Sequence, residues 1–255
     1  MHKFFTFLLL FSIPVAAAAE DLALSKLFAG QDVDGTIVIA SLNTGKTFTH
    51  NDSRARRQFS PASTFKIMNT LIAIEEKAVS GKSDVFKWNG HVYDIPNWNH
   101  DQTLESAFKV SCVWCYQELA RRIGIGKYRK YLRKSEYGKL QDSFDVTTFW
   151  LDGSLQISAF EQVNFLNRLY RRTLPFQTVA YETLGQIMLV DQTPAFSLWA
   201  KTGWTAKVGW YVGYVETPED VWFFALNMEI RNKKDLALRQ KLAHEALQIK
   251  GINVR

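Results

Sequence analysis

The chain has 255 residues, of which 47% are hydrophobic and 22% are charged, and its net charge is +6. This apolar content is enough for a sizeable core and excludes an intrinsically disordered protein. A net positive charge would favour binding to nucleic acid or to a lipid surface. However, the basic residues are scattered among acidic ones, and even the densest patches, 54–57 and 121–134, are typical of a solvated surface. We therefore predict no nucleic-acid partner.

Residues 1–19 have the pattern of a secretory signal peptide. A basic start at residues 2–3 is followed by an apolar run over residues 4–15 and then by alanines. This pattern predicts cleavage after Ala19, a mature chain of residues 20–255, and a periplasmic location. The alternative is a membrane anchor, but the apolar run is shorter than the ~20 residues that a spanning helix needs. We expect no membrane contact after cleavage.

Two regions predict β-structure, one near each end of the mature chain. Residues Thr36–Ser41 and Lys46–His50 alternate around a turn that contains glycine, as a β-hairpin does. Three further β-rich runs, Ser197–Trp204, Lys207–Glu216 and Val221–Ile230, are separated by short connections. Because a two-stranded ribbon is not stable alone, we expect both regions to contribute to one antiparallel sheet of five or more strands.

Between these regions, over residues 61–190, most segments have the pattern of helices. The clearest are 65–77, 112–123 and 161–171. A last helix is predicted over 235–250, where leucine and alanine recur near helical spacing. Such an amphipathic helix should lie on the sheet.

These elements predict an α/β (α+β) fold with an inserted all-helical part. The α/β part is formed by residues 20–60 and 191–255, and the helical part by residues 61–190. A cleft between two such parts is the natural place for a ligand.

The only two cysteines, Cys112 and Cys115, form a C-x-x-C pair. In an oxidising compartment, such a pair is compatible with redox chemistry or with half of a metal site. A metal site needs two more ligands, and the five histidines are dispersed, so we predict no metal. Buried helical thiols are the favoured interpretation, and a disulfide is the alternative.

The most informative segment predicts a nucleophile at the start of a helix. In FSPASTFKIMNTL, Ser60 is suited to cap the helix and Pro61 to be its first residue, which places Ser63 in the first turn. Free backbone amides and the positive end of the helix favour a developing oxyanion there. Lys66 follows three residues later on the same face, within reach of the Ser63 hydroxyl.

Lys66 must be uncharged to accept a proton from Ser63. An ordinary lysine has a pKa of ~10.4, and lowering it to about 7 disfavours the charged form by roughly 4 to 5 kcal/mol, which burial can supply. Apolar residues that could form such a pocket are Phe65, Ile67, Met68, Val113 and Trp150. By itself, the S-x-x-K spacing is common by chance.

Two further motifs raise the significance of Ser63 and Lys66. Ser111–Val113 (SCV) lies 48 residues after Ser63, and Lys201–Gly203 (KTG) lies 90 residues after Ser111, on a predicted strand. The set of S-x-x-K, a serine motif and K-T-G is typical of β-lactamases and penicillin-binding proteins. In this context we expect Gly203 to leave room for a substrate beside the backbone.

The chain resembles the class D (oxacillinase-type) serine β-lactamases along its whole mature length. The matching segments are STFK (63–66), SCV (111–113), WLDGSLQIS (150–158), KTGW (201–204), GWYVGYVE (209–216) and MEIRNKKDL (228–236). Ser-x-Val, rather than Ser-Asp-Asn, points to class D over class A. One departure is Tyr137–Lys139 (YGK), where the family commonly has Tyr-Gly-Asn, so a role for the third position is in doubt.

The resemblance implies a single catalytic unit that hydrolyses the β-lactam amide of penicillin-type antibiotics and confers resistance. Ser63 would form the acyl-enzyme, with the backbone amides of Ser63 and Trp204 as the oxyanion hole. Lys66 would be N-carboxylated by carbon dioxide to N6-carboxylysine and act as general base. Trp150 would donate its indole N–H to that carbamate; from the residue alone, a core tryptophan is the simpler interpretation.

Further roles follow from the same resemblance. Ser111 would relay a proton to the lactam nitrogen, and Lys201, Thr202 and Arg231 would bind the substrate carboxylate, for which arginine suits a two-pronged contact. The alternative for Arg231 is an exposed surface charge. Val113 and Leu151 would form an apolar wall near the carbamate, or belong to the plain core; Gly209 and Trp210 are interpreted as sheet packing.

The implied partners are small β-lactam molecules, with no cofactor beyond the carbon dioxide held on Lys66, and the protein would be a monomer or homodimer. Two related classes are alternatives: a penicillin-binding transpeptidase and a membrane-held β-lactam sensor. Both would be acylated by a β-lactam but would release the product with negligible turnover. The substrate spectrum is not encoded in the motifs.

Overall fold

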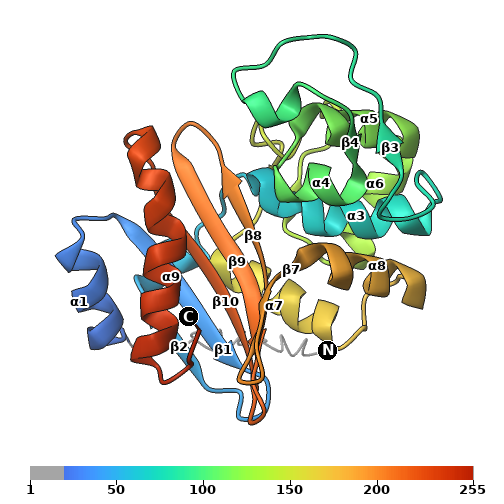
Figure 1. Ribbon diagram of the computed structural model, residues 1–255. Helices are drawn as coiled ribbons and strands as arrows, with labels where there is room; N and C mark the ends of the chain where they lie inside the picture. Colours follow the sequence, from blue (N-terminus) through green and yellow to red (C-terminus); the bar gives the residue numbers. More distant parts are fainter. Residues whose placement is uncertain (1–19, 255) are drawn as a thin grey trace, which may run out of the picture.

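The computed structural model describes residues 20–254 (Figure 1). The expected signal peptide, residues 1–19, lies outside the described residues. The centre of the molecule is a six-stranded antiparallel sheet with strand order β2-β1-β10-β9-β8-β7. Its strands are β1 (Gly35–Ser41), β2 (Thr47–His50), β7 (Leu189–Gln192), β8 (Ser197–Trp204), β9 (Val208–Glu216) and β10 (Val221–Glu229).

The sheet confirms the strands expected from the sequence, because both ends of the chain contribute to it. Strand β1 pairs with β10 in an unbroken register from Gly35↔Met228 to Ser41↔Trp222. The additional strand β7 pairs only with the first residues of β8, Ser197 to Trp199. Within the described residues, the rest of β8 therefore has a strand neighbour on one side only.

Helices cover both faces of the sheet. Helices α1 (Leu22–Gly30) and α9 (Leu238–Ile249) pack together on one face, and α7 (Ala159–Tyr170) packs on the other (Figure 1). Strands covered on both faces are apolar along their length rather than alternating. Accordingly, nearly every residue of β9 and β10 is buried. Although α7 lies in the range predicted as the inserted part, it belongs by its contacts to the layer beneath the sheet.

Helix α2 (Asp52–Arg56) packs against β1, β2 and α7. Most of the remaining elements lie beside the sheet, to the right in Figure 1. The remaining elements are α3 (Lys66–Glu75), α4 (Leu104–Lys109), α5 (Val113–Ile123), α6 (Ile125–Lys134) and α8 (Thr178–Met188), the 3-10 turns η1 (Ala62–Phe65) and η2 (Pro96–Trp98), and the short strands β3 (Val85–Phe86), β4 (Gln102–Thr103), β5 (Lys139–Leu140) and β6 (Leu155–Gln156). Helix α3 is central, since residues 66–74 are all buried.

The last helix begins later than expected. The predicted start at Asp235 belongs to the 3-10 turn η3 (Lys233–Ala237), and α9 begins at Leu238. The side chain of Asn232 accepts a hydrogen bond from the Lys234 amide and so caps the turn. This short turn redirects the chain from the end of β10 onto the sheet face.

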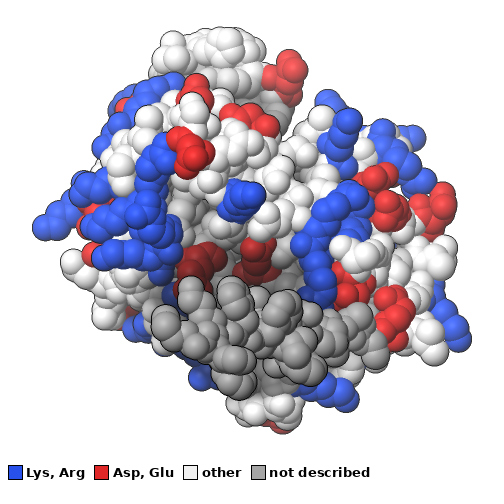
Figure 2. All heavy atoms as spheres, turned by 180° about the vertical axis from the view of Figure 1, so that it is seen from behind, with Lys and Arg blue, Asp and Glu red and all other residues white. Residues whose placement is uncertain are grey.

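Carboxylates outside the basic patch of residues 121–134 pair with several of its cations. Lys127 and Lys130 pair with Glu76, and Arg121 and Arg122 pair with Glu118. Figure 2 shows basic and acidic side chains side by side on this face of the molecule. The carboxylates neutralise part of the patch. Among the described residues, no helix combines the length and apolar character needed to cross a membrane.

Cys112 and Cys115 are joined by a disulfide. The prediction that both residues are buried is confirmed, since each is 0% exposed, but the preference for free thiols was wrong. Cys112 is not helical; it caps α5, and Cys115 lies in the first turn. Residues three apart at a helix start face each other, and the Cα atoms are 5.6 Å apart, within the usual range for a disulfide.

Candidate active site

A cavity of about 320 Å³ opens where η1, the joint between α4 and α5, strand β8 and helix α9 meet. Its lining brings together most of the site residues predicted from the sequence. The lining residues are Ser63, Ile95, Trp98, Lys109, Val110, Ser111, Val113, Leu151, Thr202, Gly203, Trp204 and Arg239.

Ser63 lies in the 3-10 turn η1, directly before α3. The preceding residue, Ala62, has a φ of +50°, in the left-handed region that non-glycine residues rarely adopt. Such a conformation persists only when the surroundings hold it, and it is commonest at functional sites. Here the Ala62 amide donates to the Trp150 carbonyl at 2.9 Å. The turn therefore holds the serine in a fixed place at the cavity.

Ser60 does not cap this helix, so that prediction was wrong. Its hydroxyl donates instead to the Trp150 carbonyl at 2.7 Å. The residue before η1 is Pro61, which makes no side-chain cap. The physical reason is tertiary: the Trp150 carbonyl lies close enough to take both the Ser60 hydroxyl and the Ala62 amide.

Lys66 is the first residue of α3, and its ammonium nitrogen lies 3.2 Å from the Ser63 hydroxyl oxygen. The side chain is 1% exposed and lies 4.5 Å from the ring centre of Tyr116. Burial, and to a lesser degree the positive charge of Lys201, holds the pKa of Lys66 well below its ordinary value. Burial therefore favours the uncharged amine, which is the form that can accept the proton of Ser63.

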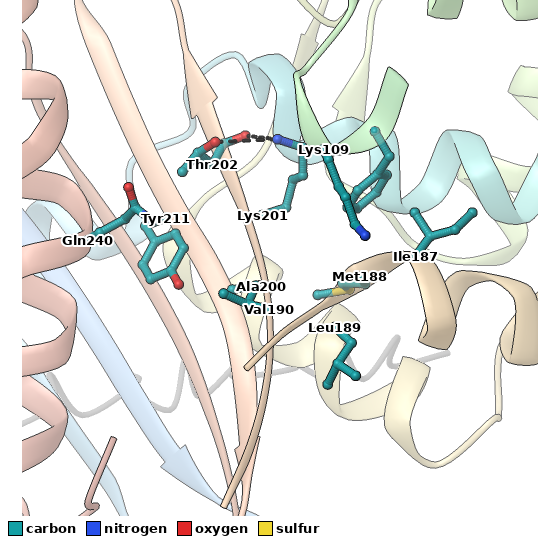
Figure 3. Close-up of a pocket in the computed structure, with 11 residues that line it drawn as sticks. Lys109, Ile187, Met188, Leu189, Val190, Ala200, Lys201, Thr202, Tyr211 and Gln240 are labelled. Carbon is teal, nitrogen blue, oxygen red and sulfur yellow. Dashed lines mark hydrogen bonds between the residues drawn. The ribbon is translucent and has the colours of Figure 1, made fainter. Parts of the chain in front are cut away.

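Lys201 projects from β8 to the other serine of the site. Its Nζ lies 2.5 Å from the Ser111 hydroxyl and 3.1 Å from the Thr202 carbonyl. Burial, with the nearby charge of Arg239, lowers the pKa of Lys201 to about 7. Figure 3 shows Lys201 reaching Thr202 at the edge of an adjoining cavity, also of about 320 Å³.

Two residues of β8 that line the cavity, Thr202 and Trp204, have backbone groups that β9 does not pair. The amide of Thr205 donates to the Val208 carbonyl and closes the tight β8–β9 turn, so Thr205 and Val208 form a hydrogen-bonded pair. Along an antiparallel ladder, hydrogen-bonded pairs alternate with pairs whose N–H and C=O groups point away from the partner strand. Trp204, opposite Gly209, therefore directs its N–H and C=O away from β9, as Thr202 does. Both residues line the same cavity as Ser63.

Packing requires a glycine at position 203. A Cβ at this position would lie 2.9 Å from the Pro61 carbonyl oxygen and 3.0 Å from the Thr64 methyl carbon. Gly203 also lines the cavity, and the expectation that it leaves room for a substrate stays a prediction. Its lack of a side chain lets η1 sit directly on β8, which brings Ser63 close to the edge of the strand.

Trp150 is 1% exposed and stacks on Phe65, with ring centres 5.8 Å apart. Its indole N–H is buried and has no hydrogen-bond partner among the described residues. Buried donors in native proteins nearly always have a partner. An unpaired N–H in the core beside η1 therefore marks a place where an acceptor fits. Leu151 and Val113 line the cavity nearby, as expected.

The structure does not bring Arg231 to the cavity. Arg231 follows β10, is 54% exposed, and pairs with Asp32 at 3.0 Å and with Asp235 at 3.7 Å. The turn at η3 holds it there, because the Arg231 amide donates to the Asp235 carboxylate at 2.8 Å. The prediction that Arg231 binds the substrate carboxylate is therefore corrected. Arg231 is an exposed surface charge, as the alternative interpretation had it.

Arg239 is the arginine that lines the cavity, and sequence reasoning missed it. It is 9% exposed and donates to the carbonyl oxygens of Leu236 at 2.7 Å and Gly203 at 2.6 Å. Burial lowers its pKa to about 10. A signal was present in the sequence, since Arg239 shares the apolar stripe of α9 with Leu242 and Ala246, where a charged residue is unexpected.

Other residues that line the cavity carried no motif. Ile95, Trp98 and Lys109 come from the loop around η2 and from the end of α4. At residues 137–139, where the sequence departs from the family motif, Tyr137 is buried and Lys139 is exposed in β5. Within residues 20–254, no group of three or more His, Cys, Asp or Glu side chains is placed to hold a metal ion.

Comparison with known proteins identifies the family. Residues 35–248 match the model of the penicillin-binding protein transpeptidase domain. The chain is 41% identical to β-lactamase OXA-48 of Klebsiella pneumoniae over 87% of this chain and 85% of that protein, and 42% identical to β-lactamase OXA-20 of Pseudomonas aeruginosa over 88% and 85%. The chain belongs to the class D serine β-lactamases.

The solved structures agree with this assignment. A class D β-lactamase from Nostoc, YbXI, superposes with a TM-score of 0.88 and 38% identity, over 90% of this chain and 99% of that one. The family, the fold class and the class of enzyme predicted from the sequence are thereby confirmed. This class D β-lactamase is a hydrolase of β-lactam antibiotics, and the cavity at Ser63 is its candidate active site.

Proposed function

We propose that the enzyme opens the β-lactam ring through an acyl-enzyme on Ser63, with N-carboxylated Lys66 as general base, and that it confers β-lactam resistance from the periplasm. The observation that carries the proposal is the pair of Ser63 and Lys66. The hydroxyl and the amine lie 3.2 Å apart, and the amine is buried with a lowered pKa. An uncharged amine beside a serine activates the hydroxyl as a nucleophile.

In the proposed acylation step, the Ser63 oxygen attacks the lactam carbonyl carbon and its proton passes to the group on Lys66. The carbonyl oxygen becomes an oxyanion, which the backbone amides of Ser63 and Trp204 can stabilise. The direction of the Trp204 amide, away from β9, supports this role. The lactam C–N bond then breaks, and the nitrogen takes a proton from the Ser111 hydroxyl, which regains one from the protonated Lys201 amine 2.5 Å away.

The residues around Lys66 fit a carbamate. Only an uncharged amine adds to carbon dioxide, a reaction that releases one proton, and burial lowers the pKa of Lys66, which favours the uncharged amine. The buried indole N–H of Trp150, which lacks a partner among the described residues, would donate to a carbamate oxygen. A carbamate in this place supplies a general base that can accept the Ser63 proton and later activate the water that hydrolyses the acyl-enzyme.

For substrate binding, we propose Lys201, Thr202 and Arg239, with Arg239 in the place expected for Arg231. Arg239 and Thr202 line the cavity, and the Nζ of Lys201 lies 3.1 Å from the Thr202 carbonyl oxygen. Together they suit the carboxylate that penicillins carry. Val113 and Leu151 supply an apolar wall beside Ser63.

The proposed location follows from residues 1–19, which have the pattern of a cleaved signal peptide. The proposed partners are small β-lactam molecules, with no role for a metal and none for nucleic acid or membrane after cleavage. N-terminal sequencing of the exported protein should begin at Glu20; an intact N-terminus in a membrane fraction would contradict this part of the proposal.

The nucleophile is tested by turnover of a chromogenic cephalosporin. The wild type should give sustained hydrolysis, and Ser63→Ala should give neither hydrolysis nor a covalent adduct by mass spectrometry. A burst of acylation with no further turnover would instead favour a transpeptidase or a sensor.

The carbamate is tested with ¹³C-labelled bicarbonate. Wild type should show a carbamate carbon signal that Lys66→Ala lacks, and activity should fall in degassed, mildly acidic buffer and return with bicarbonate. Trp150→Phe, which keeps an aromatic ring but removes the N–H donor, should need more bicarbonate for the same activity. Unchanged rates after degassing would contradict the carbamate but not the Ser63 nucleophile.

A further inference from the structure

Ser111 lies in a short joint between two helices, in an uncommon backbone conformation. Helix α4 ends at Lys109, α5 begins at Val113, and Ser111 has a φ of +56°. Serine has no intrinsic preference for the left-handed region, unlike glycine or asparagine. The conformation therefore depends on restraints from the residues on either side of the joint.

On the α4 side, ordinary hydrogen bonds close the helix. The Ser111 amide donates to the Phe108 carbonyl at 3.2 Å, and the Cys112 amide donates to the Ala107 carbonyl at 2.9 Å. These bonds resemble the pattern with which many helices end. They fix the start of the joint but not the direction in which α5 leaves it.

On the α5 side, the joint is restrained by the Sγ atom of Cys112. Cys112 is the N-cap residue of α5, and its Sγ accepts a hydrogen bond from the Cys115 amide at 3.3 Å. Sulfur is a weak acceptor compared with the oxygen of Ser, Thr, Asn or Asp, the residues that usually cap helices. The disulfide to Cys115 supplies covalently the constraint that the weak cap lacks.

The disulfide is also held by the core. Cys112 and Cys115 are 0% exposed and pack in the same apolar cluster as Phe108 of α4. The first turn of α5 thus has little freedom to rotate, and it is directly connected to Ser111. On the other side of Ser111, the hydroxyl oxygen lies 2.5 Å from the Nζ of Lys201 on β8. Ser111 is therefore held at two ends, by the disulfide turn and by the strand.

We propose that the Cys112–Cys115 disulfide is a positioning element for the reaction: it fixes the first turn of α5 and thereby keeps the Ser111 hydroxyl on Lys201, in the left-handed backbone conformation. This inference rests on the proposed function of Ser111 in delivering a proton to the lactam nitrogen. Without the bond, Ser111 can relax toward an ordinary helical conformation and its hydroxyl leaves Lys201. Acylation slows, because C–N cleavage needs that proton, whereas hydrolysis of the acyl-enzyme, which depends on Lys66, continues.

The test compares the wild type with Cys112→Ser/Cys115→Ala. Serine keeps an oxygen that can cap α5, so the variant removes the covalent bond and retains the cap. Stopped-flow measurement with a slowly hydrolysed β-lactam separates the two steps. We expect the acylation rate to fall about tenfold and the deacylation rate to change by less than about twofold. The intact mass of wild type should correspond to the disulfide form, with two hydrogens fewer than the dithiol.

A matched control separates positioning from loss of stability. Ile123→Ala removes a buried side chain at the other end of α5, far along the helix from Ser111. It should lower the melting temperature but leave the acylation rate constant of the folded protein unchanged. If the cysteine variant behaved in the same way, or acylated at the rate of wild type, the disulfide would be structural only and the inference would be wrong.

A second measurement does not depend on the variant folding. The wild-type chain is purified under dithiothreitol, which gives two electrons and two protons to the disulfide and is itself oxidised to a cyclic disulfide. The dithiol form should acylate about tenfold more slowly and recover on oxidation. Equal rates for the two redox forms, or two free thiols in the fully active protein, would overturn the inference. A wild type that shows no sustained turnover would contradict the proposed function instead.

Discussion

Lys66 and Lys201 are both buried lysines, but they lie in different regions of the molecule. Lys66 belongs to α3, in the helical core, and Lys201 to β8, near the edge of the sheet. Their exposed fractions are 1% and 4%, and burial is the main cause of the lowered pKa in both. Burial in the core holds the pKa of Lys66 well below its ordinary value, and the pKa of Lys201 is lowered to about 7.

The contacts explain why the two regions suit different tasks. The Lys66 amine has the Ser63 hydroxyl and the Tyr116 ring beside it, neither of which is charged. The Lys201 amine has the Ser111 hydroxyl and the Thr202 carbonyl oxygen, and the latter favours a proton on the nitrogen. The apolar core around Lys66 therefore suits the proposed base, and the polar contacts of Lys201 favour a protonated amine that can meet an anionic group.

The largest expected effect concerns the base in the core. Lys66→Ala should lower both the acylation and the deacylation rate by about 10³-fold, because general-base catalysis contributes about 10² to 10⁴ in rate. Pre-steady-state kinetics separates the two rates. The parallel variant Lys66→Met keeps the buried volume and should be equally inactive. Near-full turnover in either variant would show that another group accepts the Ser63 proton.

Loss of the cation at the strand edge should have a smaller effect on rate and a distinct effect on pH dependence. Lys201→Ala should lower kcat/KM by about 10²-fold, since a charge-assisted contact and the partner of Ser111 are lost. The charge of Lys201 lowers the pKa of Lys66, so its removal should raise that pKa. The acid limb of the kcat/KM profile should therefore move to higher pH. A limb that moves to lower pH would contradict the coupling.

The two arginines near the end of β10 form a matched pair. Arg239→Ala should raise KM about tenfold for a substrate with a carboxylate and change kcat less, because Arg239 lines the cavity. Arg231→Ala should change KM by less than about twofold, since Arg231 is exposed and paired with Asp32. Steady-state kinetics of both variants, with melting temperatures as a control for folding, gives the comparison. Equal effects would mean that the carboxylate lies elsewhere.

The smallest expected effect is on stability. The pKa of Lys201 is lowered to about 7 in the folded protein, from 10.5 in a solvated lysine. The unfolded state therefore binds more protons between these values, and the cost of burying this amine grows as pH falls from about 10.5 to about 7. Lys201→Met should raise the melting temperature by a few degrees at pH 7 and by less at pH 10. Calorimetry at both pH values measures the melting temperatures. An increase in melting temperature that is larger at pH 10 than at pH 7 would contradict the expectation.

Much of the fold followed from local patterns. The hairpin at β1 and β2 and the strands β8 to β10 were predicted because alternation and turn residues are properties of short segments. The pairing of Ser63 and Lys66 was predicted because residues three apart at a helix start share a face. The short edge strand β7 was not predicted, since its four residues lie at the end of a helical segment and carry no clear alternation.

The sequence by itself determined that Ser63 and Lys66 lie within contact distance, that K-T-G lies on a strand, and the order of the major elements. Only the tertiary structure decided that Arg239, and not Arg231, reaches the cavity, that Ser60 binds the Trp150 carbonyl, and that Cys112 and Cys115 form a disulfide. The physical reason is the distance along the chain over which a sequence pattern acts. Spacing along the chain fixes which side chains share a face of one helix or strand, whereas contacts between elements depend on how the whole chain packs, which no local pattern records.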